Sequence, residues 1–354
     1  MSIVIPPELE QFVEQQVASG DREWMIATLH HRETGALPYH FMLSPPARAR
    51  LESLYGPGVE DAVGLPMRIG GLKSIKPLYA PPATFGTSAR DEFGVIWSTS
   101  DVDRGAPIGP CLPQPDLAGY RFPDPAAAYR FEDLARWTAA NAGHYTFLVV
   151  GDLWERATFM RGMEPLLLDL TMSPRFVAGL LRGLADYILQ TMEVLFARFR
   201  FDGVMISDDY GTQHGMLMSP SHWRRFVKPL LAEIYALAKR HGRTVLHHSC
   251  GNILPIIGDL IEIGLDVLHP IQPEAMDVFR LKREFGRELT FCGGVRTQDL
   301  LPRGTPEQVR DEVKRLKAVM GRGGGYILEP GITLQADVSL ANLVALIEEA
   351  RVPA

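Results

Sequence analysis

The sequence predicts an α/β fold of the (β/α)8 TIM-barrel type. From about residue 126 onwards, short apolar runs alternate with longer amphipathic stretches, which is typical of parallel strands connected by helices. Seven candidate strands can be recognised, and the irregular stretch 56–90 has room for an eighth. No GxGxxG motif opens the first strand–helix unit, which argues against a doubly wound dinucleotide-binding sheet.

The N-terminal part predicts a helical segment followed by one strand and a second helix. Residues 7–30 carry apolar side chains at helical spacing, and Pro7 suits the first turn of a helix. Residues 37–42 form a short apolar run that predicts the first strand, and residues 46–55 predict a helix.

Residues 56–125 have a different composition. They are rich in Gly and Pro and contain short β-prone pieces, such as residues 91–97. We expect loops and short antiparallel strands that leave the barrel and cover one of its faces. The whole chain, 1–354, is predicted to be a single barrel domain, with a divergent part over 1–125 and regular strand–helix repeats over 126–354.

The regular part predicts six strands, each a short apolar run next to an amphipathic helical stretch. Residues 176–199 and 223–241 are the clearest of the helices. The expected strands are 145–153, 203–207, 244–248, 266–270, 289–292 and 326–328.

The composition excludes several classes of protein. The net charge is −6, and Lys and Arg are scattered, which argues against a nucleic-acid or anionic-membrane surface. The 3 cysteines, Cys111, Cys250 and Cys292, suit a reducing compartment and not a disulfide framework. No signal-peptide pattern and no long apolar run is present, so a cytoplasmic protein with a small-molecule substrate is expected.

The most informative motif is a histidine and a cysteine at the end of the strand 244–248. Residues i and i+2 of an extended chain point to the same side, so His248 and Cys250 can converge on one point. Imidazole and thiolate are favoured zinc ligands, and Gly251 lets the backbone turn after them. The alternative is a strand that carries a buried histidine and an inert cysteine.

Polar residues follow five successive strands, where barrels carry their active sites. Asp208 and Asp209 should repel each other, which raises one pKa and suits a general acid or a proton relay. The alternative is that Asp209 caps a turn while Asp208 is solvated. We expect Gln213 to line the same mouth. Glu155 follows another strand, and either enters the pocket or pairs with an arginine.

Five stretches resemble the uroporphyrinogen decarboxylase superfamily, and within it the zinc-dependent corrinoid methyltransferase branch more than the true decarboxylases. The resemblance covers residues 140–350 well and the N-terminal third only loosely, and it implies a (β/α)8 barrel. True decarboxylases carry an Arg-rich N-terminal segment, and residues 30–42 contain no counterpart. The stretches are 202–213, 248–252, 259–266, 292–295 and 323–328.

The resemblance implies a zinc site that includes His248 and Cys250, in which zinc lowers the pKa of a thiol substrate. The similar methionine synthases use a Glu where this chain has Gln272, and the methyltransferases use a final Cys where it has Ile332. Cys292 or Glu329 is therefore expected to complete the site. A metal-free site, in which His248 acts as an acid–base group, is the alternative.

The function expected from the resemblance is methyl transfer between a corrinoid (cobalamin-type) carrier protein and a thiol or similar nucleophile, or a part in an O-demethylase system. Asp208 or Asp209 would manage the proton. One alternative is a metal-free decarboxylase or other lyase that uses this aspartate pair on an acidic substrate. Another is a non-catalytic binder of a corrinoid or tetrapyrrole. The resemblance also implies a homodimer.

Overall fold

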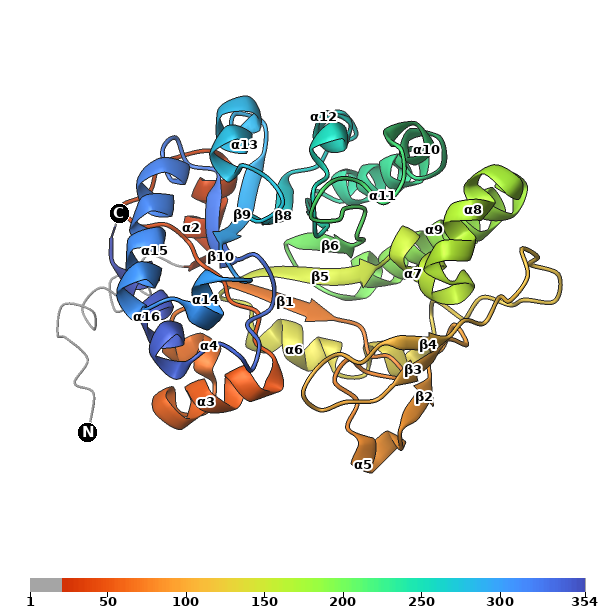
Figure 1. Ribbon diagram of the computed structural model, residues 1–354, viewed down its shortest axis with the longest axis horizontal. Helices are drawn as coiled ribbons and strands as arrows, with labels where there is room; N and C mark the ends of the chain where they lie inside the picture. The colour runs from red at the N-terminus through yellow and green to blue at the C-terminus, as the bar shows by residue number, and fades with distance from the viewer. Residues whose placement is uncertain (1–20, 354) are drawn as a thin grey trace. The chain divides into compact units, whose positions relative to one another are not determined.

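The structure is a computed structural model that describes residues 21–353 (Figure 1). Residues 7–20 of the predicted N-terminal helix lie outside the described residues. The described remainder forms α2 (Asp21–Leu29). Within the described residues, no helix is both long and apolar enough to cross a membrane.

Seven strands form the main sheet, and their order along the sheet follows their order along the chain. The pairs β5–β6, β6–β7, β8–β9 and β9–β10 are all parallel. Parallel neighbours in chain order with alternating helices are the features of a TIM-type barrel, which confirms the predicted fold class. The strands are β1 (Met67–Gly71), β5 (Tyr145–Gly151), β6 (Gly203–Ser207), β7 (Thr244–His248), β8 (Val267–Ile271), β9 (Thr290–Val295) and β10 (Tyr326–Pro330).

The two predicted strands nearest the N-terminus have different outcomes. β1 supplies the strand that was expected within residues 56–90. Residues 37–42 do not form a full strand: Tyr39 makes a single parallel bridge to Leu328 of β10. The backbone N–H of His40 donates to the Leu328 carbonyl at 3.0 Å. Pro38 has no N–H to extend this ladder, which explains why the eighth strand is so short.

The chain divides into two compact units, each built from several segments. Among the described residues, the first comprises 21–68, 141–146 and 267–353. Within it, α15 packs against β9, β10 and α16. The helices are α2, α3 (Pro45–Tyr55), α4 (Val59–Ala62), α13 (Val278–Phe285), α14 (Leu300–Arg303), α15 (Pro306–Met320) and α16 (Leu340–Arg351).

The second unit comprises residues 69–140 and 147–266. Within it, α11 packs against β7 and α9. Its helices are α5 (Pro82–Phe85), α6 (Leu134–Ala140), α7 (Trp154–Arg161), α8 (Met163–Met172), α9 (Pro174–Arg198), α10 (Pro220–Phe226), α11 (Lys228–Arg240) and α12 (Ile257–Glu262), with 3-10 turns at Ala128–Phe131 and Leu254–Ile256.

The prediction of one helix over 223–241 was wrong. The helix is interrupted at Val227, which separates α10 from α11. Pro229 has no N–H to donate to the Arg225 carbonyl, so an uninterrupted helix would lose that hydrogen bond. The helix predicted over 46–55 is confirmed as α3.

The expected excursion is confirmed as a small antiparallel sheet, β2 (Ser88–Arg90), β3 (Ile96–Ser98) and β4 (Pro107–Gly109). Asp91 organises its first turn: the buried carboxylate accepts from the Val95 N–H and from the Trp97 indole, both at 2.9 Å. Arg156 of α7 pairs with the same carboxylate at 2.8 Å, which ties the excursion to the helix after β5.

Candidate metal centre

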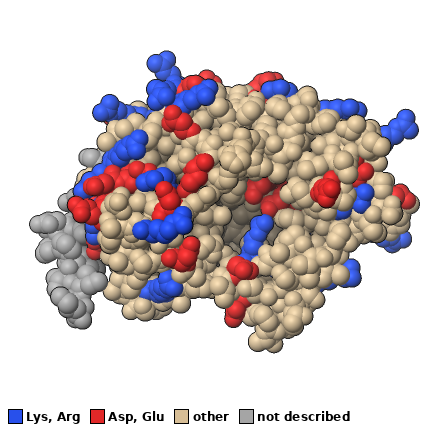
Figure 2. All heavy atoms as spheres, viewed as in Figure 1, with Lys and Arg blue, Asp and Glu red and all other residues tan. Residues whose placement is uncertain are grey.

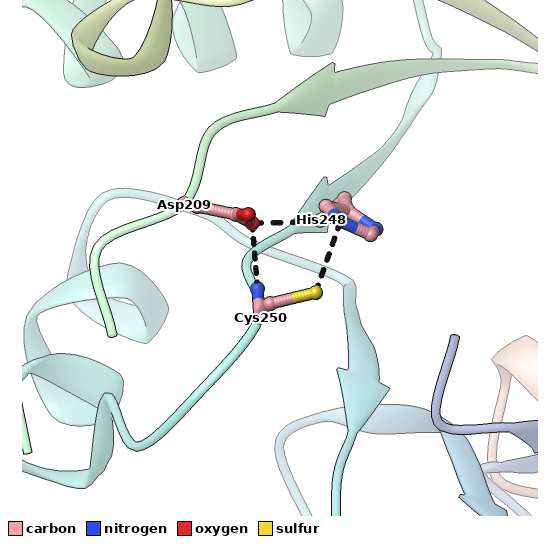
Figure 3. Close-up of side chains that lie close together, drawn as sticks. All are labelled: Asp209, His248 and Cys250. Atoms are coloured by element: carbon pink, nitrogen blue, oxygen red, sulfur yellow. Dashed lines mark hydrogen bonds and ion pairs between the residues drawn. The ribbon is translucent and has the colours of Figure 1, made fainter. Parts of the chain in front are cut away.

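His248 and Cys250 face a third side chain, Asp209, from the neighbouring strand end (Figure 3). β6 and β7 run parallel with Ser207 opposite His248. Two residues further along each chain, Asp209 therefore comes beside Cys250. The contact is direct, because the backbone N–H of Cys250 donates to Asp209 Oδ1 at 2.7 Å.

The three side chains have the spacing of a zinc site. His248 Nε2 lies 3.5 Å from Cys250 Sγ and 3.5 Å from Asp209 Oδ1. Tetrahedral zinc with ordinary bond lengths separates such ligand atoms by about 3.3–3.6 Å. The His248 and Asp209 side chains keep 14% and 32% of their surface exposed, so a fourth position can open to solvent. Three protein ligands with one open position is the arrangement of a catalytic zinc site.

Two glycines hold the loops of this group together. The loop after β6 and the loop after β7 approach so closely that a Cβ on Gly211 would lie 2.7 Å from the Cys250 carbonyl oxygen. A Cβ on Gly251, whose φ is +81°, would lie 2.4 Å from the Gly211 carbonyl carbon. The Asn252 N–H donates to the Thr212 carbonyl at 2.7 Å across the same gap. The backbone thus fixes Asp209 against Cys250.

Nearby carboxyl groups oppose the ionisation of the Cys250 thiol. Burial raises the pKa of the Cys250 thiol, and Asp209 and then Glu155 raise it further. A divalent cation would reverse this effect, since it stabilises the thiolate and the carboxylate together. The donor set, one imidazole, one thiolate and one carboxylate, matches the ligand preference of zinc.

Glu155 is a second ionisable group close to the candidate metal centre. Burial raises its pKa to about 8, and Asp209 and Asp152 add to the effect. Arg104 opposes the shift through an ion pair of 3.1 Å. The predicted arginine partner of Glu155 is therefore found in the antiparallel excursion, between β3 and β4, and not at the adjacent Arg156.

Asp208 has a different environment from Asp209. It is fully buried, and burial raises its pKa to about 7. Its Oδ1 accepts from the Glu155 N–H at 2.6 Å, and its Oδ2 accepts from the Trp154 N–H at 3.0 Å and from the Tyr210 hydroxyl. These bonds satisfy the first amides of α7, so Asp208 braces the start of that helix.

The four ligands predicted from the sequence fall into two groups, one in each unit. His248 and Cys250 lie with Asp209, whereas Cys292 and Glu329 lie with His269. Asp209 was expected to act on protons, and its position beside His248 and Cys250 was not predicted. The sequence does contain the signal, since parallel β6 and β7 place residues two positions past each strand end side by side.

The remaining predicted positions differ in exposure. Gln213 is exposed in the loop after β6. Gln272 is buried, with its side chain against Gly331. Ile332, at the position of the final cysteine of the resembling methyltransferases, is 42% exposed. That Cys292 or Glu329 completes the His248–Cys250 site stays a prediction.

Comparisons with known proteins agree with this architecture. Residues 149–352 match the family model described as uroporphyrinogen decarboxylase (URO-D). A methyltransferase from Methanosarcina mazei aligns over 94% of this chain and 98% of its own, with a TM-score of 0.70 and 16% identity. An endo-β-1,4-xylanase from Gloeophyllum trabeum aligns over 69% of this chain and 84% of its own, at a TM-score of 0.40 and 10% identity, which is too weak to support an inference. No curated protein sequence matches the chain.

Proposed function

The chain belongs to the uroporphyrinogen decarboxylase family, and from this premise we propose that it is a zinc-dependent methyltransferase. The methyl group would move between a corrinoid carrier and a thiol or similar soft nucleophile. We assign zinc to Asp209, His248 and Cys250.

The observation that carries this proposal is the geometry of the three side chains. Their ligand atoms all lie within 4.8 Å of one another, and the two distances from His248 Nε2 match the edges of a zinc tetrahedron. The thiolate and the carboxylate together balance the charge of a divalent cation. The residues present therefore fit the metal that the resemblance implies.

When bound, zinc would lower the pKa of a thiol substrate and hold it as the nucleophile. The protein's own groups position the ligands: Asp209 accepts the Cys250 N–H, and the close loops at Gly211 and Gly251 keep the two strand ends together. Burial raises the pKa of the Glu155 carboxyl to about 8, so it titrates close to neutral pH, and its ionised form would take up the proton that the thiol gives up. Arg104 orients that carboxyl.

A metal-free lyase that depends on the aspartate pair has less support. Asp208 uses both carboxylate oxygens on the amides of α7 and on Tyr210, so it has no free acceptor to offer a substrate without loosening the helix. Asp209 is the exposed member of the pair, and its nearest polar neighbours are the two other candidate zinc ligands.

The proposed partner is a protein that carries the corrinoid, and a role in an O-demethylase system is one form of the same reaction. Gln213 is exposed two residues beyond the loop glycine Gly211, and we assign it a contact with the corrinoid. Gln272 is buried, so a corrinoid would contact it only by entering the site deeply.

The test is an anaerobic assay with methylcobalamin as donor and 2-mercaptoethanol as acceptor, followed through the cobalamin spectrum. We expect the zinc-loaded protein to demethylate the donor. Cys250→Ser should reduce the rate by at least about 100-fold, because it removes a metal ligand. The matched control is Cys111→Ser, which changes a cysteine outside both groups of candidate ligands.

Two results would contradict the proposal. One is a zinc-loaded protein that transfers no methyl group although it binds the cobalamin, which would leave a non-catalytic binder. The other is transfer at the same rate in Cys250→Ser and in the control, which would remove the metal centre from the reaction.

A further inference from the structure

Three neighbouring strands of the first unit carry a second group of metal-ligating side chains. His269 lies on β8, Cys292 on β9 and Glu329 on β10. The strands pair in parallel in that order, so the three residues gather from adjacent strands. All three are buried, with exposed fractions of 0%, 0% and 1%.

The distances within this group are short. The Cys292 thiol donates to Glu329 Oε2 at 2.9 Å, and His269 Nε2 lies 3.4 Å from the same oxygen. The three ligand atoms all lie within 4.8 Å of one another. The His269–Glu329 separation equals an edge of a zinc tetrahedron, about 3.3–3.6 Å, whereas Cys292 and Glu329 are hydrogen-bonded and would move apart once the thiol proton is replaced by a metal ion.

A fourth side chain holds the carboxylate from the other side. His40 Nδ1 lies 2.9 Å from Glu329 Oε1, and its exposed fraction is only 5%. Its backbone is bonded to Leu328 of β10, next to Glu329. Carboxylates that bind metals are commonly oriented by such a hydrogen bond to the oxygen that does not face the ion.

The burial of Glu329 requires a compensating positive charge. A carboxylate removed from water is costly unless it is paired. Within residues 21–353, the basic side chains at ion-pair distance from it are His40 and His269, whose imidazoles carry a charge only when protonated. A divalent cation held between His269, Cys292 and Glu329 would supply the compensating charge with both imidazoles neutral.

We propose that His269, Cys292 and Glu329 form a second divalent-metal site, separate from the site at Asp209, His248 and Cys250, with His40 as its positioning residue. The donor set of one imidazole, one thiolate and one carboxylate selects Zn²⁺ over Mg²⁺ or Ca²⁺, which prefer oxygen ligands alone. Binding breaks the S–H bond of Cys292, forms a metal–sulfur bond and releases the proton to solvent. The thiolate and the carboxylate balance the charge of the ion.

The burial of these ligands distinguishes the second site from the first. The first keeps two partly exposed ligands, as a site with an open position requires. The second is buried, with three protein ligands and a fourth position left for a water molecule. Its contribution would therefore be to the stability of the β8–β10 region and not to turnover.

The test is the zinc content of protein that has been loaded with Zn²⁺ and desalted, measured by elemental mass spectrometry. We expect about two zinc ions per chain in the wild type, about one in Cys250→Ser, about one in Cys292→Ser and none in the double variant. Cys111→Ser is the control and should match the wild type. Circular dichroism of each variant verifies that it is folded.

If Cys292→Ser contains as much zinc as the wild type, the proposal of a second site is overturned. The three side chains would then be a buried hydrogen-bonded group without a metal. Complete loss of a single zinc in both cysteine variants would also overturn it, since one shared site would then use both cysteines, while the proposed function would stand. A single zinc that is lost only in Cys292→Ser would support the second site and contradict the first.

A spectroscopic experiment does not depend on the folding of Cys292→Ser. Cys250→Ser loaded with Co²⁺ should retain a thiolate-to-cobalt charge-transfer band, because Cys292 still supplies a sulfur ligand. Glu329→Gln in the same background should weaken or abolish the band. Folded Cys250→Ser without any such band would overturn the proposal.

Discussion

Asp208 and Asp209 are neighbours in the chain, but their surroundings differ, and we expect them to have different roles. Asp208 is buried beneath α7 and accepts three hydrogen bonds. Asp209 is partly exposed and faces His248 and Cys250. At the end of a strand, consecutive side chains point to opposite sides, which explains the division.

Asp208→Ala should lower the free energy of unfolding by about 2–4 kcal/mol, because it leaves the buried Trp154 and Glu155 amides without an acceptor. Chemical denaturation measures this loss. Asp209→Asn is the matched variant: its amide oxygen can still accept the Cys250 N–H, so stability should change little, while zinc affinity should fall about 10–100-fold. Equal loss of stability in both variants would contradict the division of roles.

Glu155 predicts a pH dependence of stability. Its pKa is raised to about 8 in the folded protein, whereas an unfolded Glu has a pKa of about 4.3. Between these values the folded state holds a proton that the unfolded state has lost, so stability falls as pH rises through this window and the penalty is complete above it.

Glu155→Gln mimics the protonated group and should remove this penalty. The melting temperature of the variant, relative to the wild type, should therefore rise between pH 5 and pH 9, which a thermal shift series would follow. Glu132→Gln, on an exposed residue paired with Lys73, is the control and should show no such trend. A difference between Glu155→Gln and the wild type that is constant with pH would exclude the raised pKa.

The sequence predicts that His248 and Cys250 point to the same side, because side chains of an extended chain alternate with a period of two residues. It does not reveal that Arg104 reaches Glu155, since that contact joins residues 51 positions apart. Cys292 and Glu329 were recognised as ligand types, but their grouping with His269 depends on the register of β8–β10, which the sequence alone does not give.

At the scale of elements, the site depends on two loops that touch through glycine. The loops after β6 and β7 bring Gly211 and Gly251 so close that neither position has room for a Cβ. The ends of these strands agree with the predicted ends, at residues 207 and 248, because each apolar run stops sharply at polar residues.

Gly211→Ala should displace the loop after β6 and separate Asp209 from Cys250. We expect a fall in zinc affinity of about 10-fold or more, while a zinc ion at the second site is retained. Gly215→Ala is the matched control in the same loop, since a Cβ there meets nothing within 4 Å. Competition with a chromophoric chelator measures the zinc affinities of both variants. Equal zinc affinities of Gly211→Ala and Gly215→Ala would contradict this role of the loop contact.

Departures of the fold from the sequence-based expectation occur where proline alters hydrogen bonding. Pro38 leaves the strand predicted over 37–42 as one bridge, and Pro229 divides the helix predicted over 223–241. A periodic apolar pattern indicates which face of a segment is buried. It gives no information on the hydrogen bonds that a proline cannot donate.

At the scale of the whole molecule, each of the two compact units contains one group of candidate metal ligands. On the face shown in Figure 2, Lys and Arg are interspersed with Asp and Glu. That the protein does not use nucleic acid as a partner stays a prediction from the net charge of −6 and the scattered basic residues. A small-molecule substrate and a protein partner stay predictions.

Zinc should stabilise the whole molecule by mass action, because the unfolded chain does not preserve either group of ligands. An excess of 100 times the dissociation constant should add about 2.7 kcal/mol to the free energy of unfolding per site. Removal of zinc with a chelator should lower the melting temperature, and re-addition should restore it. A melting temperature that is unchanged by chelation would count against both sites.

The assignment of zinc to Asp209, His248 and Cys250 can be tested by anomalous X-ray diffraction at the zinc edge on crystals of zinc-loaded protein. We expect a peak about 2.0–2.3 Å from His248 Nε2 and Cys250 Sγ, with an Asp209 carboxylate oxygen beside it. An anomalous difference map without a peak between these three side chains would contradict this assignment, whether the crystals contain zinc elsewhere or no zinc.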